Sequence, residues 1–211
     1  MLKIFYLFIR NLFFGNNIQY ASGYWSALVR KTAGDIVTNS TGTIVEFGCS
    51  EGLFLEILSV KNPSAKITGI EISPKTAEFA NTRLGSRFQN ISVIQGDARN
   101  TKFDSSSIDT IFCLNTMPNL NDQQIEKIFS EANRILKINS LFIFEIRNLS
   151  NPLMMLQYRF RKYYDPTKLD IVRAYSVNSM KELLEKYGFK IDYIQNIGIF
   201  SALKLFVVRK K

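Results

Sequence analysis

Short apolar runs alternate with amphipathic stretches from residue 43 to the end of this chain. The runs typical of buried strands cover residues 43–47, 67–72, 91–95, 108–113, 141–146, 191–196 and 203–208. The runs with helical spacing of apolar residues begin at Leu53 and cover 74–84, 122–137 and 177–187. This alternation predicts an α/β fold with a mainly parallel sheet covered by helices on both faces. The last two strands are joined without a helix and should pair antiparallel.

A glycine-bearing turn follows the first strand. Gly48 and Gly52 lie on either side of Cys49, Ser50 and Glu51, just before the helical run that begins at Leu53. Glycines let a ligand come close to bare backbone. Such a turn also points unpaired N–H groups and the positive end of the next helix at that ligand. We therefore expect a site for a nucleotide-type ligand here.

Polar residues also follow the next three strands. Glu71 ends the second strand, at the distance from the glycine turn where doubly wound folds bind a ribose diol. Asp97 follows the third strand, and Asn115 follows the fourth. The carboxyl ends of parallel strands meet at the edge of the sheet where such folds bind ligands. These residues should thus gather around one site.

Taken together, these motifs resemble the class I S-adenosylmethionine-dependent methyltransferases, particularly their small-molecule branch. The resemblance covers residues 40–210 and includes Glu131-Ala132-Asn133-Arg134-Ile135-Leu136-Lys137 before the fifth strand. It implies a doubly wound seven-stranded sheet in the order 3-2-1-4-5-7-6, with the seventh strand antiparallel. It also implies S-adenosylmethionine as the cofactor and S-adenosylhomocysteine as the product.

The resemblance also implies which residues hold the cofactor. They are Glu46, Gly48, Cys49, Ser50, Gly52, Glu71, Ile72, Asp97, Ala98 and Asn115. Glu46 and the turn would hold the amino-acid part, and Glu71 would accept from both ribose hydroxyls. Ile72 would pack on the adenine ring, Asp97 would accept from its amino group, and Ala98 would offer a backbone N–H.

One position departs from the family pattern, because Ser50 stands where a central glycine is usual. Serine would allow close approach at a negative φ, so we expect weaker accommodation of the cofactor rather than its loss. Asn115 would lie near the transferable methyl group. Other readings stay open: Gly48 and Gly52 could simply form a tight turn, Asp97 could cap a loop, and Asn115 could form a turn.

Composition restricts the chemistry. The chain has no histidine, so it lacks the commonest metal ligand and general base, and we expect no metal site. Its two cysteines, Cys49 and Cys113, both fall in predicted buried regions. A disulfide is not expected, and the cytoplasm is the expected compartment.

The net charge is +9, and the basic residues are unevenly distributed. Residues 1–34 hold four basic and no acidic side chains, 147–173 hold six basic and two acidic, and 193–211 hold four basic and none acidic. These segments could surround an acidic partner, such as a phosphate-bearing substrate or an anionic membrane. They could equally form an ordinary solvated basic surface.

Residues 1–38 are expected to form a helical N-terminal segment, followed by a methyltransferase domain over 39–211. As a helix, the apolar stretch 1–14 would measure about 21 Å, short of the roughly 30 Å needed to cross a bilayer. Two alternatives remain: a helix lying on the inner face of the membrane, or a helix packed on protein. A second helix-like run covers 18–37.

The segment 147–175 mixes aromatic and basic residues where this family often builds its substrate lid. Such a surface suits an acceptor with an apolar body and an anionic group: a small metabolite, or a lipid- or glycan-linked one. A basic solvated lid is the alternative. The substrate-binding candidates are Tyr20, Tyr24, Tyr158, Arg159 and Arg161.

Catalysis of methyl transfer requires alignment above all. Glu145, Tyr20, Tyr24, Tyr158 and Tyr175 could act as a base, but no spacing singles one out, and no base is assigned. An RNA methyltransferase and a non-catalytic scaffold are the alternative functions. A nicotinamide-dependent dehydrogenase is more remote, since the turn lacks G-x-G-x-x-G spacing.

Overall fold

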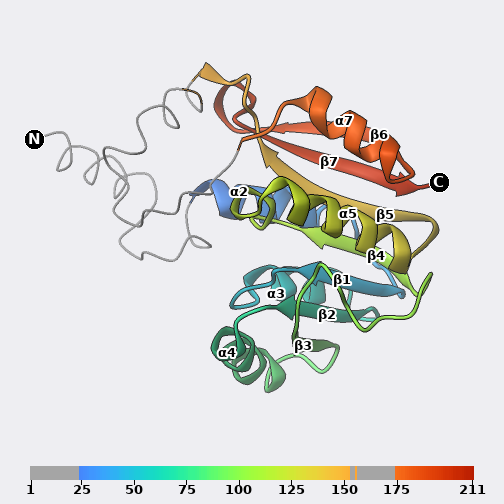
Figure 1. Ribbon diagram of the computed structural model, residues 1–211. Coiled ribbons are helices and arrows are strands. Elements are labelled where there is room, and N and C mark those ends of the chain that lie inside the picture. The colour runs from blue at the N-terminus through green and yellow to red at the C-terminus, as the bar shows by residue number, and fades with distance from the viewer. Residues whose placement is uncertain (1–23, 153–154, 156–173) are drawn as a thin grey trace, which may run out of the picture.

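The computed structural model describes residues 24–152, 155 and 174–211. Seven strands form one sheet in the order β3-β2-β1-β4-β5-β7-β6 (Figure 1). The strands are β1 (Thr43–Phe47), β2 (Lys66–Glu71), β3 (Ile91–Gln95), β4 (Ile108–Cys113), β5 (Leu136–Arg147), β6 (Phe189–Ile197) and β7 (Leu203–Lys210). β1 to β5 pair in parallel, and β7 is antiparallel to β5 and β6. The predicted strand order and the antiparallel terminal pair are confirmed.

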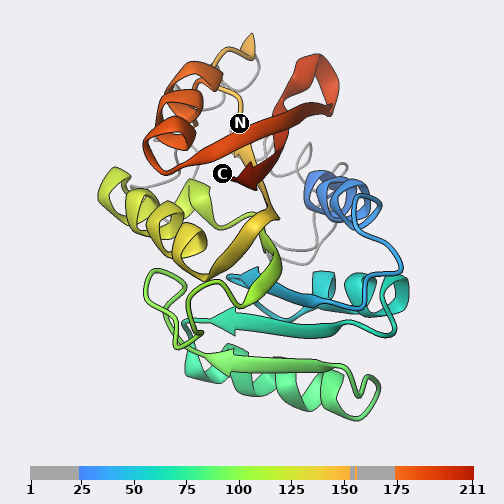
Figure 2. The same ribbon diagram turned by 90° about the vertical axis from the view of Figure 1, so that its right-hand side faces the viewer.

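Helices cover both faces of the sheet. They are α2 (Tyr24–Gly34), α3 (Leu53–Lys61), α4 (Pro74–Gly85), α5 (Asp122–Ile135) and α7 (Val177–Lys186), with short 3₁₀ helices η1 (Met117–Asn119) and η2 (Ile199–Ser201). Apolar residues of α2, α3 and α4 share one buried cluster, and those of α5 and α7 share another. Figure 2 shows α2 on the opposite side of the sheet from α5 and α7.

Local sequence signals explain where two of these helices begin. The Ser73 hydroxyl accepts a hydrogen bond from the Thr76 N–H (3.3 Å), and Pro74 occupies the first turn of α4. α5 begins with a capping box, in which Asn121 and Gln124 each bond the other's backbone N–H. Both caps satisfy N–H groups that a helix start would otherwise leave unpaired.

Three predicted boundaries were wrong. The run 18–37 was expected to be helical, but α2 ends at Gly34 and the chain then turns; residues 18–23 lie outside the described part. Helix 122–137 ends at Ile135, because Leu136 is already extended (φ −68°, ψ 140°). Leu136 pairs with Ile108, so β5 is longer than the predicted 141–146. Strand pairing thus ends the helix earlier than its apolar pattern predicts.

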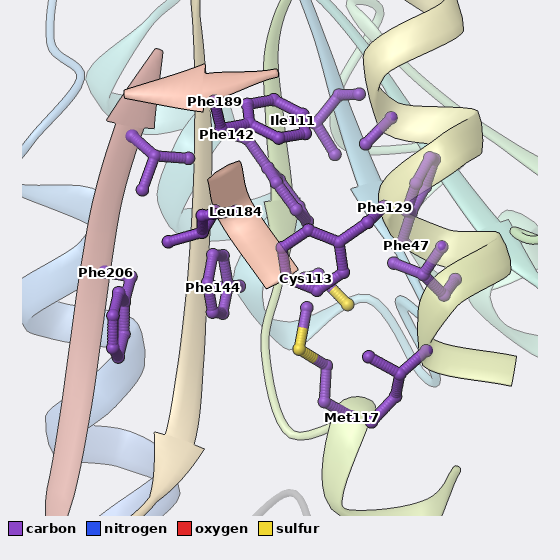
Figure 3. Packing of buried hydrophobic residues seen from close by; sticks show 14 of the residues in the cluster. Phe47, Ile111, Cys113, Met117, Phe129, Phe142, Phe144, Leu184, Phe189 and Phe206 are labelled. Atoms are coloured by element: carbon purple, nitrogen blue, oxygen red, sulfur yellow. The ribbon is translucent and has the colours of Figure 1, made fainter. Parts of the chain in front are cut away.

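An aromatic cluster fills the core between the sheet and α5 (Figure 3). Phe129 of α5 packs edge-on against Phe142 and Phe144 of β5, with ring centroids 5.5 and 5.2 Å apart. Phe144 stacks on Phe206 of β7 at 5.0 Å, and Phe189 of β6 also contacts Phe129. This cluster joins α5 to the last three strands.

Candidate functional site

A cavity of about 340 Å³ opens at the carboxyl ends of β1, β2 and β4. It is lined by Arg30, Glu46, Gly48, Cys49, Ser50, Glu51, Leu53, Phe54, Glu71, Ile72, Leu114, Asn115, Thr116, Asn119 and Leu120. Its size falls in the range of small-molecule sites. The fold thus brings most of the predicted cofactor residues together at one cavity, although they come from separate parts of the sequence.

The glycine turn packs tightly against β2. The N–H groups of Gly48 and Cys49 both donate to the Ile70 carbonyl, at 2.8 and 3.0 Å. The Gly52 N–H donates to the Cys49 carbonyl at 2.9 Å, and the Ser50 N–H donates to the Glu71 carboxylate. The expectation of unpaired N–H groups is therefore wrong at these four residues. At these four positions the turn offers a ligand a preformed shape rather than free donors.

The turn requires its two glycines for packing as well as for conformation. Gly48 and Gly52 have φ values of 74° and 77°, which non-glycine residues rarely adopt. A Cβ atom at Gly48 would collide with the Thr116 side chain, and one at Gly52 with Leu84. Thr116 in turn donates to the Phe47 carbonyl at 3.1 Å. Gly48 therefore lets β4 and the turn meet closely beneath the cavity.

Ser50 adopts a left-handed backbone, with φ of 49°. The condition under which serine would allow close approach, a negative φ, is therefore not met. The geometry of the turn demands the positive φ, and a serine there carries strain of about 1–2 kcal/mol that glycine would not. Ser50 lies on the cavity wall.

Glu71 is held in place by two backbone groups. One carboxylate oxygen accepts from the Ser50 N–H at 3.0 Å, and the other accepts from the Ser73 N–H at 2.9 Å. A carboxylate has about four lone-pair sites, so these bonds fix the group while leaving acceptor capacity toward the cavity. This suits recognition of a vicinal diol.

Asn115 also has a left-handed backbone, with φ of 55°. The buried Glu145 carboxylate accepts its N–H at 2.7 Å, the Ser26 hydroxyl donates to its side-chain oxygen at 3.3 Å, and Asn119 donates to its carbonyl. Burial raises the pKa of Glu145 to about 7. Glu145 is not among the described residues that line the cavity, so its contact with Asn115 is one of positioning.

Two buried ionisable side chains, Glu46 and Arg30, line the cavity. Glu46 is 3% exposed and Arg30 is 9% exposed, and both line the cavity. Among the described residues, Oε2 of Glu46 finds no hydrogen-bond partner. Burial raises the pKa of Glu46 to about 8, although Arg30 opposes the rise. Burial likewise lowers the pKa of Arg30 from its usual value.

The two cysteines are free, buried thiols. Burial raises the pKa of both, so neither is a ready nucleophile. Cys49 shapes the turn instead: a Cβ atom on Gly69 of β2 would lie 2.5 Å from its sulfur.

Asp97 and Ala98 are not among the described residues that line the cavity. The Asp97 carboxylate is held by Arg99, whose Nε and Nη2 donate at 2.8 and 2.6 Å. These hydrogen bonds lower the pKa of Asp97 and keep it ionised. Its contact with adenine stays a prediction.

Arg30, Thr116, Asn119 and Leu120 line the cavity but were not predicted from the sequence. One signal for Arg30 was available in the sequence: it follows the apolar Leu28 and Val29 within the run 18–37 that was predicted to be helical. The predicted Tyr20, Tyr158, Arg159 and Arg161 lie outside the described residues. Tyr24 begins α2, and Tyr175 is buried away from the cavity lining, with its hydroxyl donating to the Leu120 carbonyl.

The cavity's donor and acceptor set fits S-adenosylmethionine. Glu71 offers acceptors for a ribose diol, Ile72 offers an exposed apolar surface for a purine, and the buried Arg30 and Glu46 offer a cation and a carboxyl group for an amino acid. All of these groups reach one cavity.

Comparisons with known proteins agree with this geometry. Residues 44–139 match the family model described as a methyltransferase domain. This range covers β1 to the start of β5, and with it most of the cavity lining.

Two curated relatives match at the level of sequence. An uncharacterized protein of Methanocaldococcus jannaschii is 23% identical over 75% of this chain and 66% of its own length. A sterol 4-C-methyltransferase of Caenorhabditis elegans is 28% identical over 47% of this chain and 29% of its own length. The chain thus spans less than two thirds of either relative.

A solved structure of a protein described as a SAM-dependent methyltransferase, from Methanosarcina mazei, superposes with a TM-score of 0.66 at 18% identity. The match covers 80% of this chain and 92% of that one. These matches imply S-adenosylmethionine as the cofactor. Residues 44–139 therefore resemble a methyltransferase domain, and the chain has the fold of the class I S-adenosylmethionine-dependent methyltransferases.

Proposed function

We propose that this protein transfers the methyl group of S-adenosylmethionine to a small or lipid- or glycan-linked acceptor that carries an anionic group. The cavity is the main observation that supports methyl transfer. Its preformed turn, Glu71 and Asn115 lie at the carboxyl edge of the sheet, within the residues that match the methyltransferase domain.

The proposed cofactor contacts follow from the positions of the side chains. Glu71 accepts from the ribose hydroxyls with the lone pairs that its two backbone bonds leave over. Ile72 is 59% exposed on the cavity wall and packs on the adenine ring. Asp97, kept ionised by Arg99, accepts from the adenine amino group, and Ala98 offers its N–H. Asn115 lies beside the methionine portion.

The bound cofactor supplies an already activated methyl group, so the protein's task is alignment and exclusion of water. Positioning can account for roughly 7–11 kcal/mol of barrier lowering. α2 contributes directly: Ser26 bonds Asn115, and Arg30 lines the cavity. We propose that residues 1–38 act as a cap over the domain formed by 39–211. The Glu145 carboxylate accepts the Asn115 N–H and positions that backbone, so Glu145 is not assigned as a general base.

Exposed apolar side chains near the carboxyl end of β5 support an acceptor with an apolar body. Leu149, Met155 and Phe200 are 45%, 57% and 74% exposed. Asn151 donates to the Phe200 carbonyl at 2.7 Å, which joins the start of the proposed lid (147–175) to η2. The basic residues in and after the lid suit an anionic group on the same acceptor. The nematode relative is named for a sterol, which is an apolar acceptor.

The methyl-transfer proposal is tested in two stages. Calorimetry with S-adenosylmethionine should give saturable binding at a 1:1 ratio. Methyl transfer is then followed with labelled cofactor across acceptor pools: a lipid extract, anionic small metabolites, and bulk RNA. Label entering the lipid or metabolite pool supports the proposal. Transfer to RNA alone would overturn the proposed acceptor class. Absence of cofactor binding would overturn the proposal that the protein is a methyltransferase.

Peripheral membrane association is a separate part of the proposal. In the described residues no helix is long and apolar enough to cross a bilayer. The protein should bind vesicles of anionic lipid more tightly than neutral ones and lose that binding in high salt. Deleting residues 1–14 should weaken the binding to anionic vesicles at low salt. Equal binding to neutral and anionic vesicles would contradict the electrostatic part.

A further inference from the structure

Arg83 on α4 binds the glycine turn from outside the cavity. Its Nε and Nη2 both donate to the Glu51 carbonyl, at 3.1 and 2.9 Å. Its Nη1 donates to the carboxylate of Glu56, in the first turn of α3, at 2.6 Å. Arg83 is not among the described residues that line the cavity, and its side chain is 24% exposed. One guanidinium group thus joins the glycine turn to the start of α3.

The start of α3 depends on this contact because the helix has no side-chain cap. Its N-cap residue is Gly52, which has no side chain to accept a hydrogen bond from the first turn. Leu84, next to Arg83 on α4, packs so closely against Gly52 that an added Cβ atom would collide with it. The end of α4 therefore fixes the entry into α3, which the helix's own sequence does not.

The backbone is held on both sides of Ser50. The Ser50 N–H donates to the Glu71 carboxylate at 3.0 Å, and the next residue, Glu51, accepts the two bonds from Arg83. Ser73, at the other end of α4, donates its N–H to the same Glu71 carboxylate at 2.9 Å. The φ of 49° at Ser50 is unfavourable for serine and persists only where the surroundings fix it.

We propose that Arg83 is a positioning residue for the cofactor. It keeps the glycine turn, with Ser50 in its left-handed conformation, in the shape that the cofactor binds. This inference rests on the proposed function, because it concerns the turn that would hold the amino-acid part of the cofactor. It makes a guanidinium group outside the cavity a determinant of cofactor affinity, and it connects that role to the serine that replaces the usual glycine.

Arg87 provides a matched control on the same side of α4. It pairs with the other oxygen of the Glu56 carboxylate, and in the described part of the chain its guanidinium makes no hydrogen bond to the Glu51 carbonyl. Its side chain is 56% exposed, so this ion pair contributes little to stability. Arg83→Gln and Arg87→Gln thus remove the same charge from beside the same carboxylate, and they differ in the contact to the turn.

Calorimetry with S-adenosylhomocysteine compares the variants. Arg83→Gln should weaken binding by about three- to tenfold, because bonds from a partly exposed charged donor are lost. Arg87→Gln should bind within about twofold of the unaltered protein. Arg83→Lys keeps a cation that can reach one acceptor and should recover part of the affinity. Unchanged binding in Arg83→Gln, or equal losses at Arg83 and Arg87, would overturn the proposal.

Amide hydrogen exchange of the ligand-free protein separates a local effect on the turn from a loss of overall stability. In Arg83→Gln the peptide covering residues 48–55 should exchange at least about fivefold faster, while the peptide covering 122–135 of α5 keeps its rate. Faster exchange in both peptides alike would overturn the positioning role. If the unaltered protein does not bind S-adenosylhomocysteine, the proposed function fails, and the exchange rates still test the contact between Arg83 and the turn.

A double-mutant cycle tests the connection to Ser50. Glycine adopts a positive φ without penalty, so Arg83→Gln should cost at least about twofold less affinity in Ser50→Gly protein than in the unaltered protein. Ser106→Gly replaces another left-handed serine away from the cavity, and it should leave the effect of Arg83→Gln unchanged. Losses of equal size in all three backgrounds would overturn the connection between Arg83 and Ser50.

Discussion

The aromatic core and the cavity belong to different parts of the same sheet, and their compositions are opposite. The core beneath α5 is apolar, and Phe129 contacts rings from β5 and β6. The cavity edge holds a buried carboxylate oxygen of Glu46 that has no hydrogen-bond partner in the described part of the chain, and two left-handed non-glycine residues, Ser50 and Asn115. Each of these features costs stability. The favourable packing of the aromatic core thus offsets the free-energy cost of a site that is unfavourable by itself.

The largest expected effect comes from emptying the core. Phe129→Ala should lower the free energy of unfolding by about 3–5 kcal/mol, because it removes a fully buried ring and leaves a cavity. Urea titration measures this loss. Phe79→Ala removes a ring that is 52% exposed and should cost far less. Equal losses at the two positions would show that the aromatic cluster does not dominate stability.

The second expected effect is a pH dependence of the folding stability, which comes from buried carboxyl groups at and beside the cavity and not from the aromatic core. Glu46 and Glu145 have pKa values of about 8 and 7 in the folded protein, above the ordinary 4.5. The folded state therefore holds their protons more tightly, and the stability is present at low pH and lost as the pH rises from about 4.5 to 8. The loss should be on the order of 3–5 kcal/mol for each of the two carboxyl groups.

Thermal denaturation of the ligand-free protein between pH 5 and 8.5 measures how steeply the stability falls as the pH rises. Glu46→Gln and Glu145→Gln should each flatten it, since an amide cannot ionise. Glu78→Gln, at an exposed position, should leave it unchanged. A melting temperature that increases steadily over this pH range would contradict the burial of the two carboxyl groups.

A smaller effect concerns the ribose. Glu71→Ala should weaken S-adenosylhomocysteine and 5′-methylthioadenosine alike, by about 1–3 kcal/mol, because both carry the diol. Calorimetry gives both affinities, and Glu78→Ala is the matched control. Unchanged affinity in Glu71→Ala would remove the ribose assignment.

The smallest effect is a gain. Ser50→Gly relieves the left-handed backbone strain, partly offset by the greater freedom of glycine in the unfolded chain, for a net stabilisation of about 0.5 kcal/mol. The melting temperature should rise by about 1–2 °C. Ser106 has a similar φ of 54° away from the cavity, so Ser106→Gly should give the same gain without altering ligand affinity. A loss of stability at Ser50 alone would indicate a bond made by its side chain.

The sequence predicts the central strands well because they are apolar and buried along nearly their whole length, as at 43–47 and 108–113. It predicts the site at the sheet edge because the topology brings Glu71 and Asn115 beside the glycine turn. It misses what depends on contacts between distant segments. The meeting of Arg30 and Glu46 and the early end of α5 both result from packing that no local pattern encodes.

The backbone of Ser50 shows the same limit. Serine at a usual glycine position suggests a relaxed, negative φ, but the turn must place two N–H groups on Ile70 and one on Glu71. The hydrogen bonds to β2 then impose the conformation on whichever residue stands there.

The position of β7 between β5 and β6 has a consequence for synthesis on the ribosome. β6 pairs only with a strand that emerges after it among the described strands, and β5 keeps an open edge until then. A nascent chain that has reached Ile197 but not Leu203 exposes the Phe144 edge of the aromatic core, with Phe206 still missing. This interval is when chaperone binding or aggregation should compete most strongly with folding.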